Sequence, residues 1–580
     1  MHSEVLGKHS TPHARNLRGV EDFRKVLPET ADELSVLPRQ HLLEALQRVP
    51  PGEIENVLQT RLIPVAWIPN LVLYAACGPS AVKRAKQQGL KLVAQVAASD
   101  FHWAVRKLWG RKLLHKATQE LFETTPQKSA RKRVTPAQIL VLLSAVGCIA
   151  FAMVYMPLAA NWLAANVALT FFFLSVISLR LFGLLPETGS SPGAAKLLAE
   201  QKLPVYTVLV PVFRETAVLE QLLRALQNLN YPALKLDIKI IVEESDLPMR
   251  RALAGYVLPS QFDVIIVPSG NPQTKPRALN YALQFARGSL LTIYDAEDIP
   301  APNQLRVAAR EFSQDTNDLA CLQAKLVFFN ADENWLTRQF AAEYATLFGL
   351  ILPSLADCGL PLPLGGTSNH FRTSILREVG AWDPYNVTED ADLGFRLARA
   401  GYRTGVIDSL TYEEANTQYL NWFRQRARWL KGFMQTWLVQ MRNPAASIKE
   451  LGLTGFWVLQ SFTAGTFVSA LFHPLLLALM VLQFVLTPLP LPQASLLAIE
   501  LGGLNLVVFV LGYGVAMVAA SKALRNQGMR GWWFTLCTMP IYWLLMSGAA
   551  WLALWQLITS PHSWNKTEHG LSKLQKTWNN

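Results

Sequence analysis

Two long apolar runs that stand close together constrain the fold of this chain more than any other feature. Residues 137–157 and 162–185 are each long enough to cross about 30 Å of hydrocarbon, and the loop around Asn161 between them is uncharged. The chain has 580 residues, of which 51% are hydrophobic and 17 are Trp. We therefore expect a polar domain between two sets of membrane helices, the second set lying in three further apolar segments at 456–486, 496–519 and 532–558.

Basic residues predict which side of the membrane the polar domain occupies. Arg131, Lys132 and Arg133 precede the first apolar run, and the positive-inside rule places them in the cytoplasm. The hairpin 137–185 returns the chain to the same side, so residues 187–450 are expected to be cytoplasmic. Lys+Arg exceed Asp+Glu by 54 to 42, but the basic residues cluster beside apolar runs, which argues against a nucleic-acid partner.

The polar domain has the pattern of an α/β fold. Between Tyr206 and Thr411, apolar strand-like runs alternate with helical stretches, which predicts a largely parallel sheet built from βαβ units. Ligands of such sheets bind beyond the carboxyl ends of the strands. Acidic residues that directly follow a strand are therefore expected in the binding pocket.

Two acidic clusters follow predicted strands in this way. "YDAED" supplies Asp295, Glu297 and Asp298, and Mg²⁺ is commonly held by one or two such carboxylates together with substrate phosphates. "VEESD" supplies Glu244 and Asp246, which could accept hydrogen bonds from a base or a ribose. For each cluster taken alone, a solvated turn is the alternative.

Four further stretches supply groups of the kind that bind phosphates and sugars. Lys275 opens a predicted helix, and the Gly-rich turn "LGGTSNHFR" holds Gly366, Thr367 and His370, of which His370 is expected to be structural. A third acidic group, Thr388-Glu389-Asp390, stands at the start of a helix. A later helix, rich in aromatic residues, carries Gln425, Arg428 and Trp429, and it could also lie in the membrane interface.

In this order, these motifs resemble those of the family 2 glycosyltransferases, specifically the membrane-embedded polysaccharide synthases related to cellulose, hyaluronan and chitin synthases. The resemblance covers residues 205–440. It implies a GT-A-type catalytic domain inserted between transmembrane helices, and a bacterial inner-membrane protein. Thr388-Glu389-Asp390 and Gln425-x-x-Arg428-Trp429 match the family pattern letter for letter, whereas the metal motif has Glu297 where the family has Asp.

The resemblance also implies roles for individual residues. Asp390, with Thr388 and Glu389 beside it, would be the general base that takes a proton from the acceptor hydroxyl. Asp295, with Glu297 or Asp298, would hold Mg²⁺ or Mn²⁺. The substrate-binding residues would be Pro211, Glu215, Glu244, Asp246, Lys275, Asp295, Gly366, Thr367, Gln425, Arg428, Trp429, Lys566 and Thr567.

The tail 559–580 raises a question of topology. Five simple spans would place it outside, yet it contains Lys566, Lys573 and Lys576. Its stretch "SWNKTEHG" resembles the gating loop that acts at the cytoplasmic active site of such synthases, with a chance likeness in a surface tail as the alternative. If the likeness is real, either 456–486 or 532–558 is partly interfacial or re-entrant.

The N-terminal part is expected to form a separate module. After a polar stretch 1–35, residues 36–130 combine the strand-like runs "LVLYAAC" and "LKLVAQVAA" with helices, which predicts a small α/β domain. It resembles the N-terminal domain of type II secretion ATPases, which in some relatives binds cyclic di-GMP, although the Arg-Leu-Gly motif of that domain is not recognisable. A docking or structural module is the alternative, and secretion-complex subunits are the partners that a docking role would imply.

Together these observations predict an inverting transferase. It would move a hexose, by resemblance glucose, from a UDP-sugar to a growing glycan at a membrane, and it could be processive with coupled secretion. Two alternatives remain: transfer of one sugar to a polyprenyl phosphate lipid carrier, and a non-catalytic membrane receptor or cyclic di-GMP sensor on a transferase scaffold.

Overall fold

The computed structural model describes residues 34–68, 71–185, 197–315, 318–486, 496–564, 566–568 and 570–573. It consists of two compact units, Met1–Lys112 and Leu113–Asn580. The polar stretch 1–35 and the loop 487–495 fall almost wholly outside the described residues, as does Lys576. The long helix α5 (Ala98–Thr124) begins in the first unit and ends in the second, so the last residues of the expected module 36–130 belong to the larger unit.

The N-terminal unit is a small α/β domain, as its sequence pattern predicts. Its four-stranded sheet has the order β1-β4-β3-β2, in which β3 pairs in parallel with β4 and antiparallel with β2. The two strand-like runs of the sequence form β3 and β4. Its elements are β1 (Ser35–Val36), α2 (Arg39–Gln47), α3 (Ile54–Thr60), β2 (Leu62–Ile68), β3 (Leu71–Cys77), α4 (Pro79–Gln87) and β4 (Lys91–Val96).

The larger unit is built on an eight-stranded mixed sheet with the order β7-β6-β5-β8-β11-β10-β12-β9. The strands β7, β6, β5 and β8 are parallel, as are β10 and β12, whereas β11 and β9 run antiparallel to their neighbours. The strands are β5 (Tyr206–Val212), β6 (Leu236–Glu243), β7 (Phe262–Val267), β8 (Leu290–Ile293), β9 (Ile299–Pro300), β10 (Leu319–Phe328), β11 (Asn369–Arg372) and β12 (Arg403–Glu413).

Helices pack on the sheet because its central strands are apolar on both sides. Every residue of β6 is buried, including Lys239, which is paired with Asp237 and Asp263 at 2.9 and 2.8 Å. Near-continuous apolar runs of this kind are typical of parallel strands covered on both faces. The helices of this domain are α8 (Leu219–Gln227), α9 (Leu247–Ala254), α10 (Lys275–Leu283), α11 (Gln304–Gln314), α12 (Trp335–Thr346), α13 (Leu352–Asp357), α14 (Thr373–Glu378), α15 (Glu389–Arg399) and α16 (Tyr419–Gln440).

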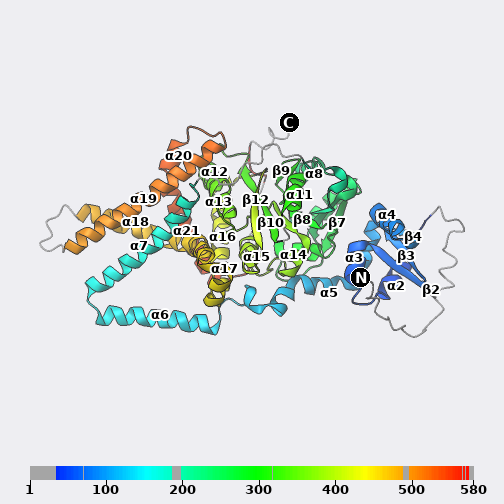
Figure 1. Ribbon diagram of the computed structural model, residues 1–580, viewed down its shortest axis with the longest axis horizontal. Coiled ribbons are helices and arrows are strands. Elements are labelled where there is room, and N and C mark those ends of the chain that lie inside the picture. The colour runs from blue at the N-terminus through cyan, green and yellow to red at the C-terminus, as the bar shows by residue number, and fades with distance from the viewer. Residues whose placement is uncertain are drawn as a thin grey trace, which may run out of the picture. The chain divides into compact units, whose positions relative to one another are not determined.

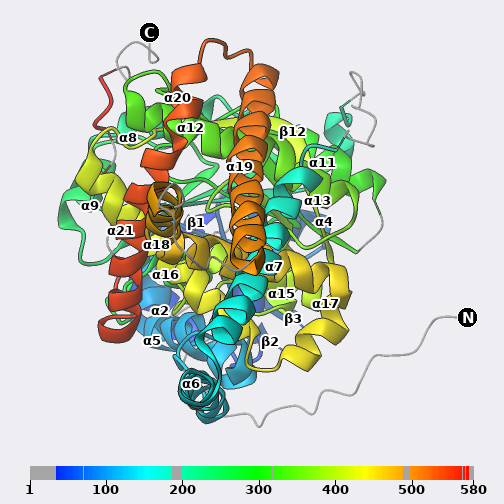
Figure 2. The same cartoon turned by 90° about the vertical axis from the view of Figure 1, so that its left-hand side faces the viewer.

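Apolar helices flank this domain in the chain and gather on one side of its sheet (Figure 1). Five helical segments among the described residues are long and apolar enough to cross a membrane, and they coincide with the five apolar runs of the sequence. In Figure 2, α7 and α19 lie side by side. The elements are α6 (Pro136–Tyr155), α7 (Leu158–Phe182), α17 (Pro444–Leu459), η5 (Gln460–Ala464), α18 (Gly465–Leu486), α19 (Leu496–Asn526), α20 (Trp533–Cys537) and α21 (Met539–Thr559).

The helix α16 joins the sheet domain to the apolar helices. It packs against α21 through a cluster in which Ala427 and Leu430 meet Ala549 and Ala550, all of them buried. The small residues on α21 let the two helix backbones come close together. The side chains of α16 therefore stand between the carboxyl edge of the sheet and the membrane helices.

Candidate active site

One cavity of about 1320 Å³ opens at the carboxyl edge of the sheet and continues between the apolar helices. It brings together residues from strand ends, from the helices α10, α15 and α16 and from the tail, which lie up to several hundred positions apart in the sequence. The sequence-predicted residues on its walls are Pro211, Glu215, Lys275, Asp295, Glu297, Gly366, Thr367, Thr388, Glu389, Asp390, Gln425, Arg428, Trp429, Lys566 and Thr567.

Four carboxyl groups crowd one end of the cavity. Asp295, Glu297 and Asp298 follow β8, and Glu413 reaches them from the end of β12. Burial, and then the charge of Asp295, raises the pKa of Glu297 to about 8. Burial and the neighbouring acids also raise the pKa of Asp298 and Glu413 well above their ordinary values. Burial and mutual repulsion therefore disfavour the ionised form of these carboxyl groups, and a bound cation would offset both effects.

Lys275 is a positive group beside this cluster. Its ammonium nitrogen lies 2.5 Å from Oδ1 of Asp295 and donates a hydrogen bond of 2.7 Å to the carbonyl oxygen of Gly366. Burial alone would lower the pKa of Lys275, but Asp295, Glu389 and Asp390 raise it above its ordinary value. Lys275 is therefore a permanently charged group between the two sets of acids.

Gly366 leaves room for a ligand between the two sets of acids. A Cβ atom at this position would lie 3.2 Å from Oδ2 of Asp390 and 3.8 Å from the Lys275 ammonium nitrogen. A side chain there would fill the space between the second acid group and the lysine. Absence of a side chain thus keeps both groups open to the cavity.

The second acid group opens α15. Glu389, Asp390 and Asp392 all lie in its first turn, where the helix dipole favours negative charge, and Asp390 Oδ1 accepts a 2.7 Å hydrogen bond from the Ala391 amide. Burial nevertheless raises the pKa of Asp390, and burial together with the charge of Asp390 raises the pKa of Glu389 to about 7. The pKa of each group is therefore raised, and the two carboxyl groups titrate as a coupled pair.

The helix α16 places two arginines, Arg426 and Arg428, on the cavity wall, and their contacts differ. Arg428 faces Glu389, Asp390 and Asp295, and its Nε atom is buried without a hydrogen-bond partner. Arg426, in contrast, forms a bidentate pair with Glu343 at 2.7 and 2.8 Å, so it is occupied within the protein. Arg428 remains the arginine of this motif that is available to an anionic ligand.

Aromatic rings line the same wall. Trp429 lies 6.2 Å from Tyr344 with nearly parallel rings and 5.8 Å from Phe340 at an angle. The guanidinium of Arg426 sits 4.8 Å from the Trp429 ring centre. These contacts fix the indole, which lines the cavity as a flat apolar surface suited to a sugar ring.

The C-terminal tail lies across the cavity. Lys566 pairs with Glu215 at 2.9 Å and donates to the carbonyl oxygen of Phe213, while Trp564 lies under the guanidinium of Arg428 at 5.6 Å. The hydroxyl of Thr567 is buried on the wall without a partner. Asn565 and His569 of the predicted gating-loop motif lie outside the described residues.

A carboxylate that the sequence analysis did not single out anchors the tail. Glu414 accepts backbone hydrogen bonds from Gly570, Leu571 and Ser572 at 2.6, 2.8 and 2.7 Å. Glu413 and Glu414 stand together at the end of β12, in "TYEEAN", which is the same signal, acids directly after a strand, that pointed to Asp295. That signal was therefore sufficient to find both residues.

Three predicted residues lie away from the cavity walls. Glu243, rather than Glu244, lines the cavity, and it pairs with Arg277 at 2.5 Å. Asp246 caps α9 through the Met249 amide and also accepts from the Arg214 amide at 2.6 Å. Asp298 lies beneath the acid cluster, where it accepts from the Asp295 amide at 2.7 Å and from the Thr367 hydroxyl. The contacts of Asp246 and Asp298 are structural.

The expectation that His370 is structural agrees with its surroundings. It is fully buried within the sheet, where its Nδ1 lies 2.7 Å from the Tyr206 hydroxyl and its Nε2 lies 3.2 Å from Gln304 Oε1. Burial lowers its pKa to about 3, so the ring stays neutral.

The acid cluster fits a hard divalent cation that is shared with a ligand. Carboxylate oxygens are the donors that Mg²⁺ and Mn²⁺ prefer, and the carboxyl groups of Asp295 and Glu297 line the same end of the cavity. Within the described residues, no three acidic, His or Cys side chains are arranged to hold a metal on their own. A cation here would therefore be held by Asp295 and Glu297 together with oxygens of a ligand and water.

The cavity changes character as it passes between the apolar helices. There its walls come from α7, α18, α19 and α21, and aromatic rings dominate them, including Phe173, Phe509 and Trp543. A few polar groups interrupt the apolar surface, among them Asn166 and Asn505, which share a 2.6 Å hydrogen bond. A ligand that extends from Asp390 into this part must therefore tolerate apolar and aromatic surroundings.

Comparison with known proteins identifies the domain that holds this site. Residues 290–562 match the model of the glycosyl transferase family group 2. The chain is 26% identical over 235 residues to a probable glycosyltransferase, YdaM, of Bacillus subtilis, which covers 40% of this chain and 56% of that protein. It is 29% identical over 243 residues to a beta-monoglucosyldiacylglycerol synthase of Trichormus variabilis, covering 41% and 50% of the two chains.

A cellulose synthase catalytic subunit of Xanthomonas axonopodis is 28% identical over 254 residues, covering 43% of this chain and 34% of that one. The chain thus spans about half the length, or less, of these curated relatives. Among solved structures, a mannosyltransferase from Pyrobaculum calidifontis, in complex with GDP-Man and Mn²⁺, superimposes with a TM-score of 0.42 at 16% identity, covering 68% of this chain and 97% of that one. The expected fold class, a GT-A-type α/β domain between apolar helices, is confirmed. The matched region begins at residue 290 and does not include the N-terminal unit.

Proposed function

We propose that this chain, which carries a family 2 glycosyltransferase domain, is an inverting transferase that moves a hexose from a UDP-sugar to a growing polysaccharide at a membrane. Glucose is the sugar that the sequence resemblance favours. The catalytic domain faces the cytoplasm of a bacterial cell in this proposal, which rests on the positive-inside rule applied to Arg131, Lys132 and Arg133.

Asp390 is the general base of the proposed reaction. The acceptor hydroxyl attacks the anomeric carbon of the donor sugar, the bond from that carbon to the diphosphate breaks, and Asp390 takes the hydroxyl proton. A single displacement of this kind inverts the configuration at the anomeric carbon. The first turn of α15 fixes the carboxylate, because the Ala391 amide donates to it at 2.7 Å.

Two cationic groups face the leaving diphosphate. Lys275 lies between Asp295 and Gly366, and Arg428 has an unpartnered Nε atom in the same cavity. Charge-assisted hydrogen bonds from both would stabilise the negative charge that develops on UDP. A Mg²⁺ or Mn²⁺ ion held by Asp295 and Glu297 would neutralise diphosphate charge in the same place.

The observation that carries the proposal is the placement of Asp390, Lys275 and Arg428 on one cavity wall, with Gly366 leaving space between the base and the lysine. A base alone would suit many reactions, and a basic pocket alone would suit many phosphate ligands. Their combination beside an acid cluster suits transfer from a nucleotide-diphosphate sugar.

A polysaccharide acceptor is supported by the aromatic wall. Trp429 lies on the cavity wall beside the predicted base, and rings continue along the cavity between α7, α18, α19 and α21. Such rings can stack against successive sugars. The continuous cavity also leaves room for processive extension with movement of the product between these helices.

A lipid acceptor is the second candidate. The apolar character of the cavity between the membrane helices favours it, because an acyl or prenyl chain would fill this space. One relative is named for a lipid product, a beta-monoglucosyldiacylglycerol synthase, and another for a polysaccharide, a cellulose synthase catalytic subunit. Regulation by cyclic di-GMP, or docking of the N-terminal unit to secretion subunits, rests on the sequence resemblance alone.

UDP release from detergent-purified full-length protein tests the proposal. We expect release with one UDP-hexose in the presence of Mg²⁺ or Mn²⁺, and a loss of about 100-fold or more in Asp390→Asn. Release that is unchanged in this variant would remove Asp390 as the base. With a radiolabelled donor sugar, label that partitions into organic solvent would favour the lipid acceptor, whereas aqueous, glycosidase-sensitive label would favour the polysaccharide.

A further inference from the structure

The segment Pro126–Arg133, here called the connector, links α5 to the first apolar helix and lies against the catalytic domain. It contains one short helical turn, η1 (Pro126–Lys128). Ser129 and Ala130 within it are buried, although the residues around them are partly exposed. A connecting segment with a buried centre must have its polar backbone groups satisfied by something other than water.

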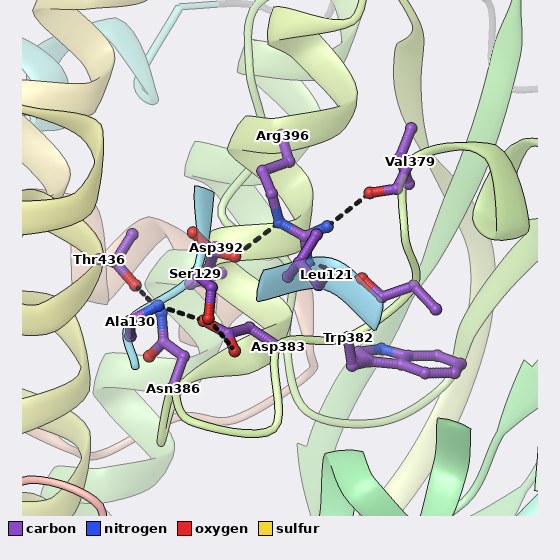
Figure 3. A network of polar contacts seen from close by, with 12 residues as sticks. Leu121, Ser129, Ala130, Val379, Trp382, Asp383, Asn386, Asp392, Arg396 and Thr436 are labelled. Atoms are coloured by element: carbon purple, nitrogen blue, oxygen red, sulfur yellow. Dashed lines mark hydrogen bonds and ion pairs between the residues drawn. The ribbon is translucent and has the colours of Figure 1, made fainter. Parts of the chain in front are cut away.

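The carboxylate of Asp383 accepts from one backbone donor and one side-chain donor of this buried centre (Figure 3). Its Oδ1 accepts a 3.1 Å hydrogen bond from the Ser129 hydroxyl, and its Oδ2 accepts from the Ala130 amide at 2.5 Å. Asp383 is fully buried. Its Oδ1 also accepts a 3.1 Å hydrogen bond from the Tyr385 amide. The Asp383 carboxylate thus accepts hydrogen bonds from three donors and acts only as an acceptor in these contacts.

The side chain of Arg442 also holds the connector. The guanidinium of Arg442, two residues beyond the end of α16, donates to the carbonyl oxygens of Pro126, Gln127 and Ser129 at 3.0, 3.0 and 2.9 Å. It donates to the carbonyl oxygen of Lys132 as well. The connector is therefore fixed both to the loop that contains Asp383 and to the helix that carries Arg428 and Trp429.

Polar contacts continue from Asp383 to the start of α15. Asn386 donates to the Thr436 hydroxyl of α16 at 2.9 Å and accepts from the Thr388 amide at 3.1 Å (Figure 3 shows Asn386 and Thr436 next to the Asp383 cluster). The Val387 amide donates to Gln435 at 3.1 Å. Asp383, Asn386, Val387 and Thr388 are thus each held by a contact to the connector, to α16 or to their own loop, whereas Pro384 accepts from the Thr274 hydroxyl at 3.0 Å.

The chain before Asp383 is held in the same way. Arg396 of α15 pairs with Asp392 at 2.7 Å and donates to the carbonyl oxygens of Val379 and Ala381 at 2.9 and 2.6 Å. Asn280 donates to the Trp382 carbonyl at 2.7 Å and to the Ala117 carbonyl of α5 at 3.1 Å. Asp383 is therefore the buried contact between the connector and this hydrogen-bonded loop, and Arg131 makes a second contact over the Tyr385 ring at 5.6 Å.

We propose that Asp383 is a positioning residue for the base Asp390, and that the connector, through Ser129 and Ala130, sets where the residues 383–390 lie. The inference rests on the proposed function, in which Asp390 takes the acceptor proton. Movement of α5 or of the first apolar helix would then reach the base through Asp383 rather than through the donor site. The connector is a structural part of the active site although no atom of it lines the cavity.

The test uses the full-length protein with Ser129→Ala and Asp383→Asn, with Gln127→Ala as the matched control. The Gln127 side chain is exposed, and its backbone carbonyl, which contacts Arg442, is retained in the control. We expect Ser129→Ala and Asp383→Asn each to lower kcat about 10-fold or more and to change the KM for the donor less than twofold. A misplaced base slows the chemical step without removing donor contacts. The double variant should lose no more than the worse single one.

Hydrogen–deuterium exchange separates this inference from the proposed function. Peptides that cover residues 384–392 should exchange faster in Ser129→Ala than in wild type and in Gln127→Ala, whether or not any donor is turned over. Equal exchange in all three proteins would overturn the positioning role. A wild type that releases no UDP with any donor, but shows the exchange difference, would instead count against the transferase reaction.

Discussion

The ammonium nitrogen of Lys275 and the Oδ1 atom of Asp295 lie 2.5 Å apart, in a pair that bridges the acid cluster after β8 and the acid group at the start of α15. A group in this position meets any diphosphate that binds at the carboxyl edge of the sheet. It also limits the repulsion between the carboxylates on either side of it.

Replacing Lys275 by Met should therefore impair both donor binding and leaving-group stabilisation. We expect kcat/KM for the donor to fall about 100-fold, the magnitude typical of losing one strong donor to a developing negative charge. Lys275→Arg should retain part of the activity, because the charge remains. Steady-state kinetics of UDP release measure this, and a Met variant with wild-type kcat/KM would exclude contact between Lys275 and the diphosphate.

Gly432 of α16 should be intolerant of any side chain. A Cβ atom there would overlap Thr388, the residue directly before the Glu389–Asp390 pair. Gly432→Ala should thus push the start of α15 and lower transfer activity by about 10-fold or more. Gly349→Ala is the control, since a Cβ atom at that helical glycine meets nothing within 4 Å. Equal activities of the two variants would show that Thr388 can move without consequence.

The pH dependence of transfer should report the Glu389–Asp390 pair. Burial raises the pKa of Asp390 above 3.8 and that of Glu389 to about 7, so the base becomes protonated, and inactive, at a higher pH than an ordinary aspartate would. Activity should therefore rise with pH through the acid limb of the profile and level off above it. Lys275 and Arg428 lower the pKa of Asp390, so in Arg428→Met the limb should move to higher pH. A limb at the same pH in both proteins would contradict this electrostatic contact.

Arg426 and Arg424 should differ in their effects on stability. Arg426 is buried and pairs with Glu343 through both carboxylate oxygens, and its guanidinium also donates to the Tyr542 hydroxyl at 2.8 Å. Arg426→Met should lower the free energy of unfolding by about 3 kcal/mol or less. Glu343 is partly exposed, so water can solvate its carboxylate in part when the arginine is removed. Arg424→Met, at an exposed position of the same helix, should leave the apparent Tm of the detergent-solubilised protein unchanged. Similar losses would show that the Glu343 pair contributes nothing specific.

The sequence was sufficient to predict features that depend on local order along the chain. Acids directly after a buried strand reach the carboxyl edge of the sheet, which is why Asp295 and Glu297 were found. The choice of Glu244 over Glu243 failed to match the cavity wall for an equally local reason. Neighbouring residues of a strand point to opposite faces, and the position at which β6 ends decides which of the two glutamates faces the cavity.

Contacts between distant segments carried no local signal. Asp383 and Ser129 stand 254 positions apart, and each appears in the sequence as an ordinary turn residue. Glu343, which forms the ion pair with Arg426, lies in a helix that contains none of the sequence motifs. The tail could be placed at the active site only through its likeness to a gating loop. The acids of "TYEEAN" carry the same local signal as Asp295, but that signal does not show that Glu414 holds the tail.

The first apolar helix gives the connector a further consequence. None of the most apolar stretch of α6 is buried within the protein, so its apolar side chains are exposed and suited to a lipid environment. It begins at Pro136 with a capping box on Thr135, only three residues after the connector ends at Arg133. The depth of α6 in the bilayer would therefore set the position of the connector and, through Asp383, the position of the base Asp390. We expect the bilayer to act as one wall of the catalytic scaffold, so that turnover in vesicles varies with acyl-chain length while donor affinity does not.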